Sequence, residues 1–228
     1  MKRIKTFSEL HEAFKDFKLP SYWLFRGQSD SSWGLHPKCS RPPYCLRDDQ
    51  EMFTLWKRNA IELCDNPPDD DWHWLALAQH HGLSTRLLDW SSNPLVAAFF
   101  ACKDNDDNDG AIFAYLGSKY IMPQSFKQAS PWDVKDPSIF YPFIKNRRVH
   151  NQRGSFTITS DTKTCFYDQV QDNERIDKII IDKAYKQELM FELNFYGINW
   201  GTLYPDLDGH SKLMNWYVEY GDENFNGA

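Results

Sequence analysis

The strongest constraint on the fold is residues 93–102, which have the pattern of a helix buried on every side. Asn93 and Pro94 are typical of a helix start, with Asn93 as the N-cap and Pro94 at the first helical position. The next eight residues, Leu95 to Cys102, are all apolar. A helix that is apolar all round is covered by other elements. We therefore expect this helix in the interior.

The remaining helices and strands are mixed without regular alternation. Helices are expected from Thr6 to before Pro20, from Asp48, over 72–81, over 183–196 and from 205 to about 219, and strands over 21–26, 110–116, 154–159 and 176–181. Proline-containing stretches at 29–47 and 117–146 indicate irregular structure. This order predicts an α+β fold with mixed, mostly antiparallel small sheets and flanking helices. With no linker in the sequence, we expect one domain over 1–228, with its motifs in about 21–216.

Charge and cysteine content narrow the class of protein. The net charge of -6 argues against a general duplex-DNA footprint, although Arg147, Arg148, His150 and Arg153 form a local basic patch, or a solvated loop. The five cysteines are scattered, which argues against a disulfide framework or a structural zinc site. No apolar run approaches a membrane span, so we expect no membrane partner and a cytoplasmic location.

Two polar stretches are the candidate site. Arg26 follows an apolar run and precedes Gly27, which places a cation at a strand end; a guanidinium there suits phosphate or carboxylate, or simply forms a salt bridge. Gly27 would let a ligand approach the backbone. Residues 79–91 combine imidazoles, a guanidinium, a carboxylate, an indole and hydroxyls, a mixture typical of a ligand pocket.

The sequence lacks several common kinds of site. Other residues have two possible roles. The sequence has no dinucleotide fingerprint, P-loop, nucleophile elbow or H-E-x-x-H motif. The adjacent histidines 80 and 81 are poorly placed to share a metal, and local sequence does not support a triad of Ser84, His81 and Asp89. Asp89 either pairs with Arg86 or orients a histidine, and Trp90 is core or a stacking wall.

Five blocks in order along the chain carry a family resemblance. They are Phe25-Arg26-Gly27, the segment 79–90, Asn93-Pro94-Leu95, Gln152-x-Gly154-x-Phe156 and the segment 203–209. Together they resemble the FRG domain, which is named after its Phe-Arg-Gly motif and occurs in bacterial and phage-related proteins. The layout of these blocks is also similar to that of the ADP-ribosyltransferase superfamily, which implies a transferase-like fold with NAD as the substrate.

The resemblance implies a role for each block. In many of those transferases an aromatic-Arg-Gly motif ends the first core strand and its arginine holds NAD phosphate or ribose, as Arg26 would here. Trp33, Trp90 or Phe156 would stack on the nicotinamide. The implied cofactor-binding set is Phe25, Arg26, Gly27, Gln28, His80, Arg86, Trp90, Gly154 and Phe156, and the implied catalytic set is His81, Thr85, Asp89 and Gln152.

One departure from the transferase pattern leaves three functions open. Residues 151–156 contain no glutamate, whereas the corresponding transferase strand carries the catalytic one; Gln152 can replace its hydrogen bond but not its charge. The first function is an NAD-dependent toxin or anti-phage effector that modifies RNA, DNA or protein and is partnered by an antitoxin or chaperone. The second is a non-enzymatic nucleotide-, RNA- or partner-binding module. The third is a metal-dependent hydrolase or nuclease that uses Asp206 and Asp208, whose alternative role is a turn and helix cap.

Overall fold

The strands join into one sheet, which confirms an α+β fold with mostly antiparallel pairing. The computed structural model describes residues 2–18, 22–104, 106–142 and 152–221. Its strands are β1 (Lys2–Ile4), β2 (Leu24–Gln28), β3 (Leu88–Ser91), β4 (Gly110–Leu116), β5 (Ser138–Phe140), β6 (Gly154–Ile158) and β7 (Arg175–Ile181), in the order β1-β7-β4-β2-β3-β6-β5. Only the β1–β7 pair is parallel among these strands. The prediction of several small sheets was wrong, because the described strands form one.

Side-chain caps start most of the helices where the sequence predicts them. Thr6 accepts from the Glu9 N–H, Asp48 from the Glu51 N–H and Asn93 from the Leu95 N–H. The α-helices of the described residues are α1 (Phe7–Phe14), α2 (Asp49–Ala60), α3 (Asp71–His80), α4 (Pro94–Cys102), α6 (Lys186–Phe195), α7 (Trp200–Leu203) and α8 (Leu207–Tyr220). None of the helices in this part of the chain is long and apolar enough to cross a membrane.

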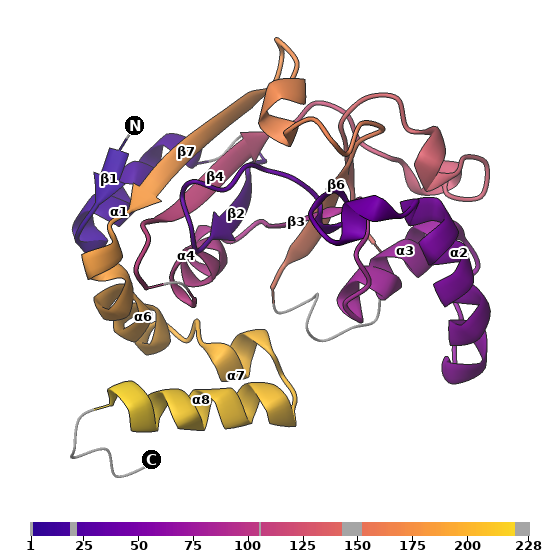
Figure 1. Cartoon of the computed structure of the whole chain (residues 1–228). Coiled ribbons are helices and arrows are strands. Elements are labelled where there is room, and N and C mark those ends of the chain that lie inside the picture. The colour runs from indigo at the N-terminus through magenta and orange to yellow at the C-terminus, as the bar shows by residue number, and fades with distance from the viewer. Residues whose placement is uncertain (1, 19–21, 105, 143–151, 222–228) are drawn as a thin grey trace.

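Two groups of helices pack on one face of the sheet and leave a space between them. α1, α4, α6 and α8 form one core with β2, β4 and β7, while α2 and α3 form a second with β5 and β6 (Figure 1). Most of α4 is buried, as its apolar sequence predicts. Register places Phe25, Ser91 and Asp89 on this same face. A third core, around Trp90, Phe113 and Tyr115, covers the opposite face.

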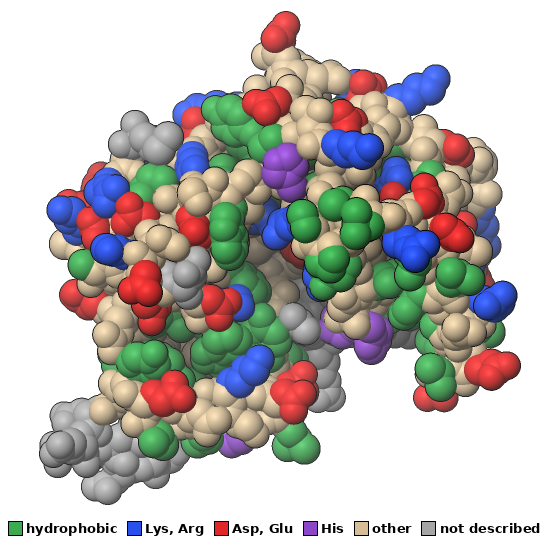
Figure 2. Space-filling view, in the orientation of Figure 1, with side chains coloured by type: hydrophobic (Ala, Val, Ile, Leu, Met, Phe, Trp, Pro, Cys, Tyr) green, Lys and Arg blue, Asp and Glu red, His purple; other side chains and the backbone are tan. Residues whose placement is uncertain are grey.

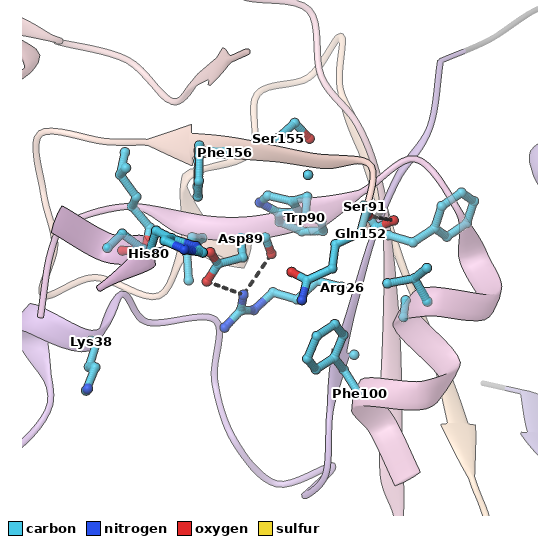
Figure 3. Close-up of a pocket in the computed structure, with 18 of the residues that line it drawn as sticks. Arg26, Lys38, His80, Asp89, Trp90, Ser91, Phe100, Gln152, Ser155 and Phe156 are labelled. Carbon is cyan, nitrogen blue, oxygen red and sulfur yellow. Dashed lines mark hydrogen bonds and ion pairs between the residues drawn. The ribbon is translucent and has the colours of Figure 1, made fainter. Parts of the chain in front are cut away.

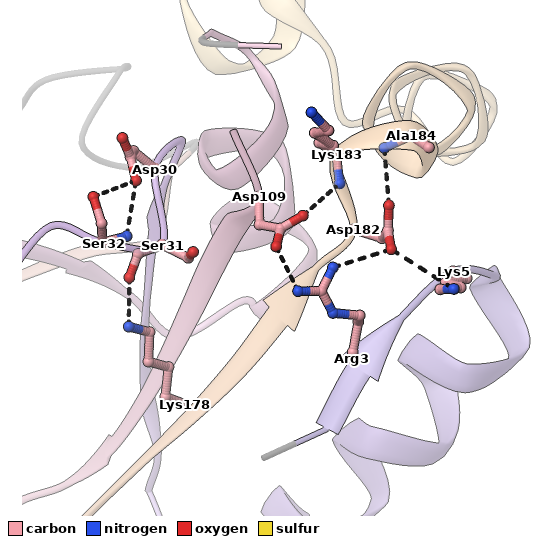
Figure 4. A network of polar contacts seen from close by, with 10 residues as sticks. All are labelled: Arg3, Lys5, Asp30, Ser31, Ser32, Asp109, Lys178, Asp182, Lys183 and Ala184. Atoms are coloured by element: carbon pink, nitrogen blue, oxygen red, sulfur yellow. Dashed lines mark hydrogen bonds and ion pairs between the residues drawn. The ribbon is translucent and has the colours of Figure 1, made fainter. Parts of the chain in front are cut away.

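Polar contacts fasten the edge strand β1 to its surroundings. Arg3 forms ion pairs with Asp109 at 2.7 Å and Asp182 at 3.2 Å. The same two carboxylates accept backbone N–H groups of Lys183 and Ala184, each at 3.0 Å (Figure 4). Because β1 has only three residues, these side-chain contacts supplement a short ladder with β7.

The sequence predicted neither β1, β3 and β5 nor the short helix α7. All four of these elements have only three or four residues, too few for periodicity to show, and β3 also lies within the polar block 79–91. Of the basic patch, Arg147, Arg148 and His150 lie outside the described residues. Arg153 is described, and its carbonyl accepts the Ser92 N–H at 3.2 Å.

Candidate functional site

The sheet opens between β2 and β3, and a cavity of about 330 Å³ lies at the opening. Within the described strands, β2 and β3 share one registered pair, Phe25 with Ser91. The cavity is walled by β2, β3, β6, α3, α4 and the segment that follows β2 (Figure 3). Its lining residues include Phe25, Arg26, Gly27, Lys38, Arg41, Gln79, His80, Asp89, Trp90, Ser91, Phe100, Gln152, Gly154 and Phe156. Its size is at the lower end of the range for small-molecule sites.

Arg26 lies where the two strands separate. Its Nη1 donates to the Asp89 carbonyl at 2.7 Å and lies 3.6 Å from Asp89 Oδ2. The side chain is 16% exposed, against 62% for Asp89. Its buried Nε has no hydrogen-bond partner among the described residues. The guanidinium thus replaces ladder bonds that the diverging strands do not make, and it retains unused hydrogen-bonding capacity.

The charge in the cavity is opposite in sign to that of the whole chain. Three lining side chains, Arg26, Lys38 and Arg41, are cationic, and among the described lining residues Asp89 supplies the one carboxylate. By contrast, acidic and basic side chains are interspersed over the face seen in Figure 2, and the chain carries a net charge of -6. The cavity therefore suits an anionic ligand.

Burial disfavours the charged form of both arginines in the cavity. It lowers the pKa of Arg26, the Asp89 carboxylate opposes that shift, and Arg41 lowers the pKa further. Burial likewise lowers the pKa of Arg41, again opposed by Asp89. Because a guanidinium does not lose its proton in proteins, both groups remain charged. A bound anion would relieve part of this cost.

Gly27 faces α4, which gives its small size a different reason from the predicted one. A Cβ built on Gly27 would lie 1.9 Å from the Ala97 carbonyl oxygen and 2.6 Å from the Ala101 nitrogen. The absence of a side chain lets the buried helix pack directly on β2. The glycine shapes the cavity through the position of α4, which contributes Val96, Ala97 and Phe100 to its lining.

The aromatic candidates are largely core residues. Trp90 is 3% exposed, its indole N–H donates to Thr157 at 2.8 Å, and its ring packs on Tyr115 and Phe166. Phe156 is 5% exposed and lies opposite Asp89 on the same face of the sheet. Trp33 is 46% exposed and is not part of the lining.

Four of the predicted site residues lie outside the cavity lining, and their contacts are with the protein. Arg86 forms a bidentate ion pair with Asp49, both hydrogen bonds at 2.8 Å, and lies over the Trp132 ring. His81 is the C-cap of α3, and the Gln28 amide donates to the Gly34 carbonyl at 3.3 Å. The Thr85 hydroxyl donates to the side-chain carbonyl of Gln79. Thr85 thus orients a lining residue without lining the cavity itself.

Gln152 reaches the cavity with its amide already engaged. Its side-chain N–H donates to the Leu203 carbonyl at 3.1 Å, and its backbone carbonyl accepts the Ser91 hydroxyl at 2.6 Å. These contacts tie the start of β6 to β3 and α7. Because the Gln152 amide is neutral, the negative charge among the described lining residues comes from Asp89.

The structure adds Lys38, Arg41 and Phe100 to the predicted set. The two cations come from a proline-containing stretch that has no periodicity, and their one sequence signal is basic character near Pro37 and Pro42. Phe100 is one of many apolar residues in α4, and nothing in the sequence distinguishes a lining ring from a core ring.

Comparison with known protein families supports the resemblance to the FRG domain. The FRG domain family matches residues 21–110, so this part of the chain is an FRG domain. The match runs from the segment before β2 to the start of β4 and includes Arg26, Arg41 and Asp89. No curated protein and no solved structure matches the chain.

Proposed function

We propose that this FRG domain is an NAD-dependent ADP-ribosyltransferase whose donor binds in the cavity between β2 and β3. The observation that carries the proposal is a partly buried arginine, Arg26, beside the exposed Asp89 carboxylate in a cationic cavity of an acidic chain. Guanidinium groups suit the NAD pyrophosphate, and a carboxylate suits the positive charge that develops on the ribose. From the family resemblance, we further propose a role as a toxin or anti-phage effector.

The reaction assigns separate roles to the two groups. Arg26 would hold the donor phosphates. The bond from ribose C1′ to nicotinamide nitrogen would break, its electron pair would leave with nicotinamide, and an oxocarbenium-like centre would develop at C1′. Asp89 would stabilise that centre in place of the missing glutamate. An acceptor nucleophile would then form a bond to C1′ and lose its proton to solvent or to a nearby base, for which His80 is a candidate.

Labelled NAD tests this proposal directly. Purified protein is incubated with separate RNA, DNA and protein fractions, and transferred label is counted. We expect Asp89→Asn to reduce transfer by about 10²-fold with NAD affinity retained, because a charge at a preorganised site acts mainly in the transition state. Arg26→Gln can keep a hydrogen bond to the Asp89 carbonyl, and we expect it to weaken NAD binding by about 10-fold or more.

Arg47→Gln provides the matched control, since Arg47 is an exposed arginine outside the cavity. It should leave transfer unchanged. Full transfer by folded Arg26→Gln protein would refute the assignment of the cavity, while full transfer by Asp89→Asn would move the catalytic charge elsewhere. The acceptor fraction that takes the label would name the acceptor class.

One observation favours the second function, a non-enzymatic module. Gln152 stands where the family resemblance would place a catalytic glutamate, and its amide is used in a structural contact. A binding module would bind NAD or RNA in the same cavity and release no nicotinamide, so the same assay separates the two functions.

The third function has less support. Asp206 accepts the Gly209 N–H at 2.8 Å as the N-cap of α8. No group of three or more His, Cys, Asp or Glu side chains suited to a metal occurs among the described residues.

A further inference from the structure

A segment after β2 adds a second set of cations to the cavity. Lys38 and Arg41 flank the buried Cys39, which fixes the backbone between them. The Cys39 N–H donates to the Thr85 carbonyl at 3.2 Å, which attaches the segment to the chain leading into β3. Both cationic side chains are thus carried by backbone that the core holds in place.

Each of these side chains keeps donors for a ligand. Arg41 uses Nε, at 3.0 Å, and Nη2 on the His36 carbonyl. Lys38 makes a 3.3 Å hydrogen bond to the Gly82 carbonyl and lies 5.1 Å from the centre of the Tyr44 ring. An ammonium has three donors and a guanidinium five, so these contacts orient the groups without using all their hydrogen-bonding capacity.

The cations are distributed along the cavity. Figure 3 shows Lys38 and His80 toward one end, Phe100 and Gln152 toward the other, and Arg26 with Asp89 between them. The Asp89 carboxylate opposes the pKa shifts of both Arg26 and Arg41, so two guanidinium groups share the attraction of one negative charge. A single phosphate on Arg26 would leave the charge at the Lys38 end without an ionic partner in the lining.

We propose that Lys38 and Arg41 form a second anion subsite beside Arg26, which makes the cavity selective for nucleotides with a pyrophosphate over nucleotides with one phosphate. The inference rests on the proposed function only in taking the ligand to be a nucleotide. The pyrophosphate would span Arg26 and the Lys38–Arg41 segment, and the planar end of the ligand would lie toward Phe100.

Calorimetric binding of two non-reacting nucleotides tests the subsite without any turnover. ADP-ribose carries two singly charged phosphates, whereas AMP concentrates nearly the same charge on one phosphorus. We expect ADP-ribose to bind the intact chain at least about 10-fold more tightly than AMP. In Lys38→Gln and in Arg41→Gln the affinity for ADP-ribose should fall by about 10-fold, while the affinity for AMP falls by less than about 3-fold.

Two controls separate the subsite from simpler causes. Arg47→Gln removes the same charge outside the cavity and should change neither affinity. Arg41→Gln also breaks the contact with His36, so Lys38→Gln, in which the altered side chain is exposed, is the variant less prone to misfolding. Equal affinity of the intact chain for both nucleotides, binding of neither, or equal losses in Lys38→Gln would overturn the proposal. Selective ADP-ribose binding without label transfer from NAD would uphold the subsite and refute the transferase.

Discussion

The three residues of the Phe-Arg-Gly motif have three separate structural causes. Phe25 packs into the core against Phe14 and Phe17. Arg26, which alternates to the other side of the strand, reaches the Asp89 carbonyl across the opening. Gly27 lies against α4 with no room for a side chain. One tripeptide therefore anchors the strand, places a cation in the cavity and admits the buried helix.

The role of Gly27 predicts a large effect of a single methyl group. Gly27→Ala would place Cβ 1.9 Å from the Ala97 carbonyl oxygen, so α4 has to move away from β2. We expect a loss of about 3 kcal/mol in the free energy of unfolding, measured by urea titration. Gly82→Ala is the matched control: it lies at φ 92° with nothing near its Cβ, and should cost about 1–2 kcal/mol through backbone strain alone. An equal cost for both variants would contradict the packing role of Gly27.

At the scale of elements, the sequence predicts those helices and strands whose ends or burial are set by neighbouring residues in the chain. Capping residues such as Asp48 and Asn93 mark helix starts, and the apolar run in α4 correctly indicates burial. β3 escapes prediction because it has only four residues within the polar block 79–91, too few for its alternation of apolar and polar side chains to stand out. Short strands such as β1 exist because neighbours pair with them, which is a tertiary effect without a local signal.

The candidate site likewise has residues that the sequence indicates correctly and residues whose role depends on distant partners. Arg26, His80, Asp89 and Gln152 stand out as polar residues in or beside apolar segments, and the structure brings them together in one cavity. Arg86 has the same local character but pairs with Asp49, 37 residues earlier in the chain. No local pattern reveals a partner at that separation, so sequence reasoning cannot separate a structural arginine from a ligand-binding one.

The ion pair between Asp182 and Arg3 predicts that acid weakens the attachment of the edge strand β1. Hydrogen bonds from the Ala184 N–H and then from Arg3 hold the pKa of Asp182 below its ordinary range. A carboxyl with a lowered folded-state pKa stabilises the fold fully above its unfolded pKa, and the stabilisation is lost as pH falls through the folded value. We expect the free energy of unfolding to drop below about pH 4. In Asp182→Asn the value should already be lower at pH 7 and should drop less with acid.

Urea titrations from pH 3 to 7 measure this difference. Asp172→Asn, a change at an exposed aspartate that takes no part in this contact, serves as the control and should follow the intact chain. Parallel pH curves for the intact chain and Asp182→Asn would show that the contact contributes no pH dependence.

At the scale of the whole molecule, the cavity lies where two packed units meet. The core around α4 and the core around α3 belong to different parts of the sheet, which are joined between β2 and β3 by one registered pair. Arg26 is on one side of this junction and Asp89 on the other. A ligand that contacts both would add to the few bonds across the junction and stabilise the entire fold.

Thermal unfolding with a non-cleavable NAD analogue measures that coupling. A ligand at 100 times its Kd stabilises the folded state by about 2.7 kcal/mol, which for a chain of this size raises Tm by about 5–10 °C. A carbocyclic analogue, whose ribose cannot form the oxocarbenium ion, keeps turnover out of the measurement. In Arg26→Gln the same concentration should produce a much smaller rise, because the cation at the junction is gone, whereas Arg47→Gln should give the full rise. A full rise in Arg26→Gln would place the nucleotide outside this cavity and leave the opening between β2 and β3 with a purely structural role.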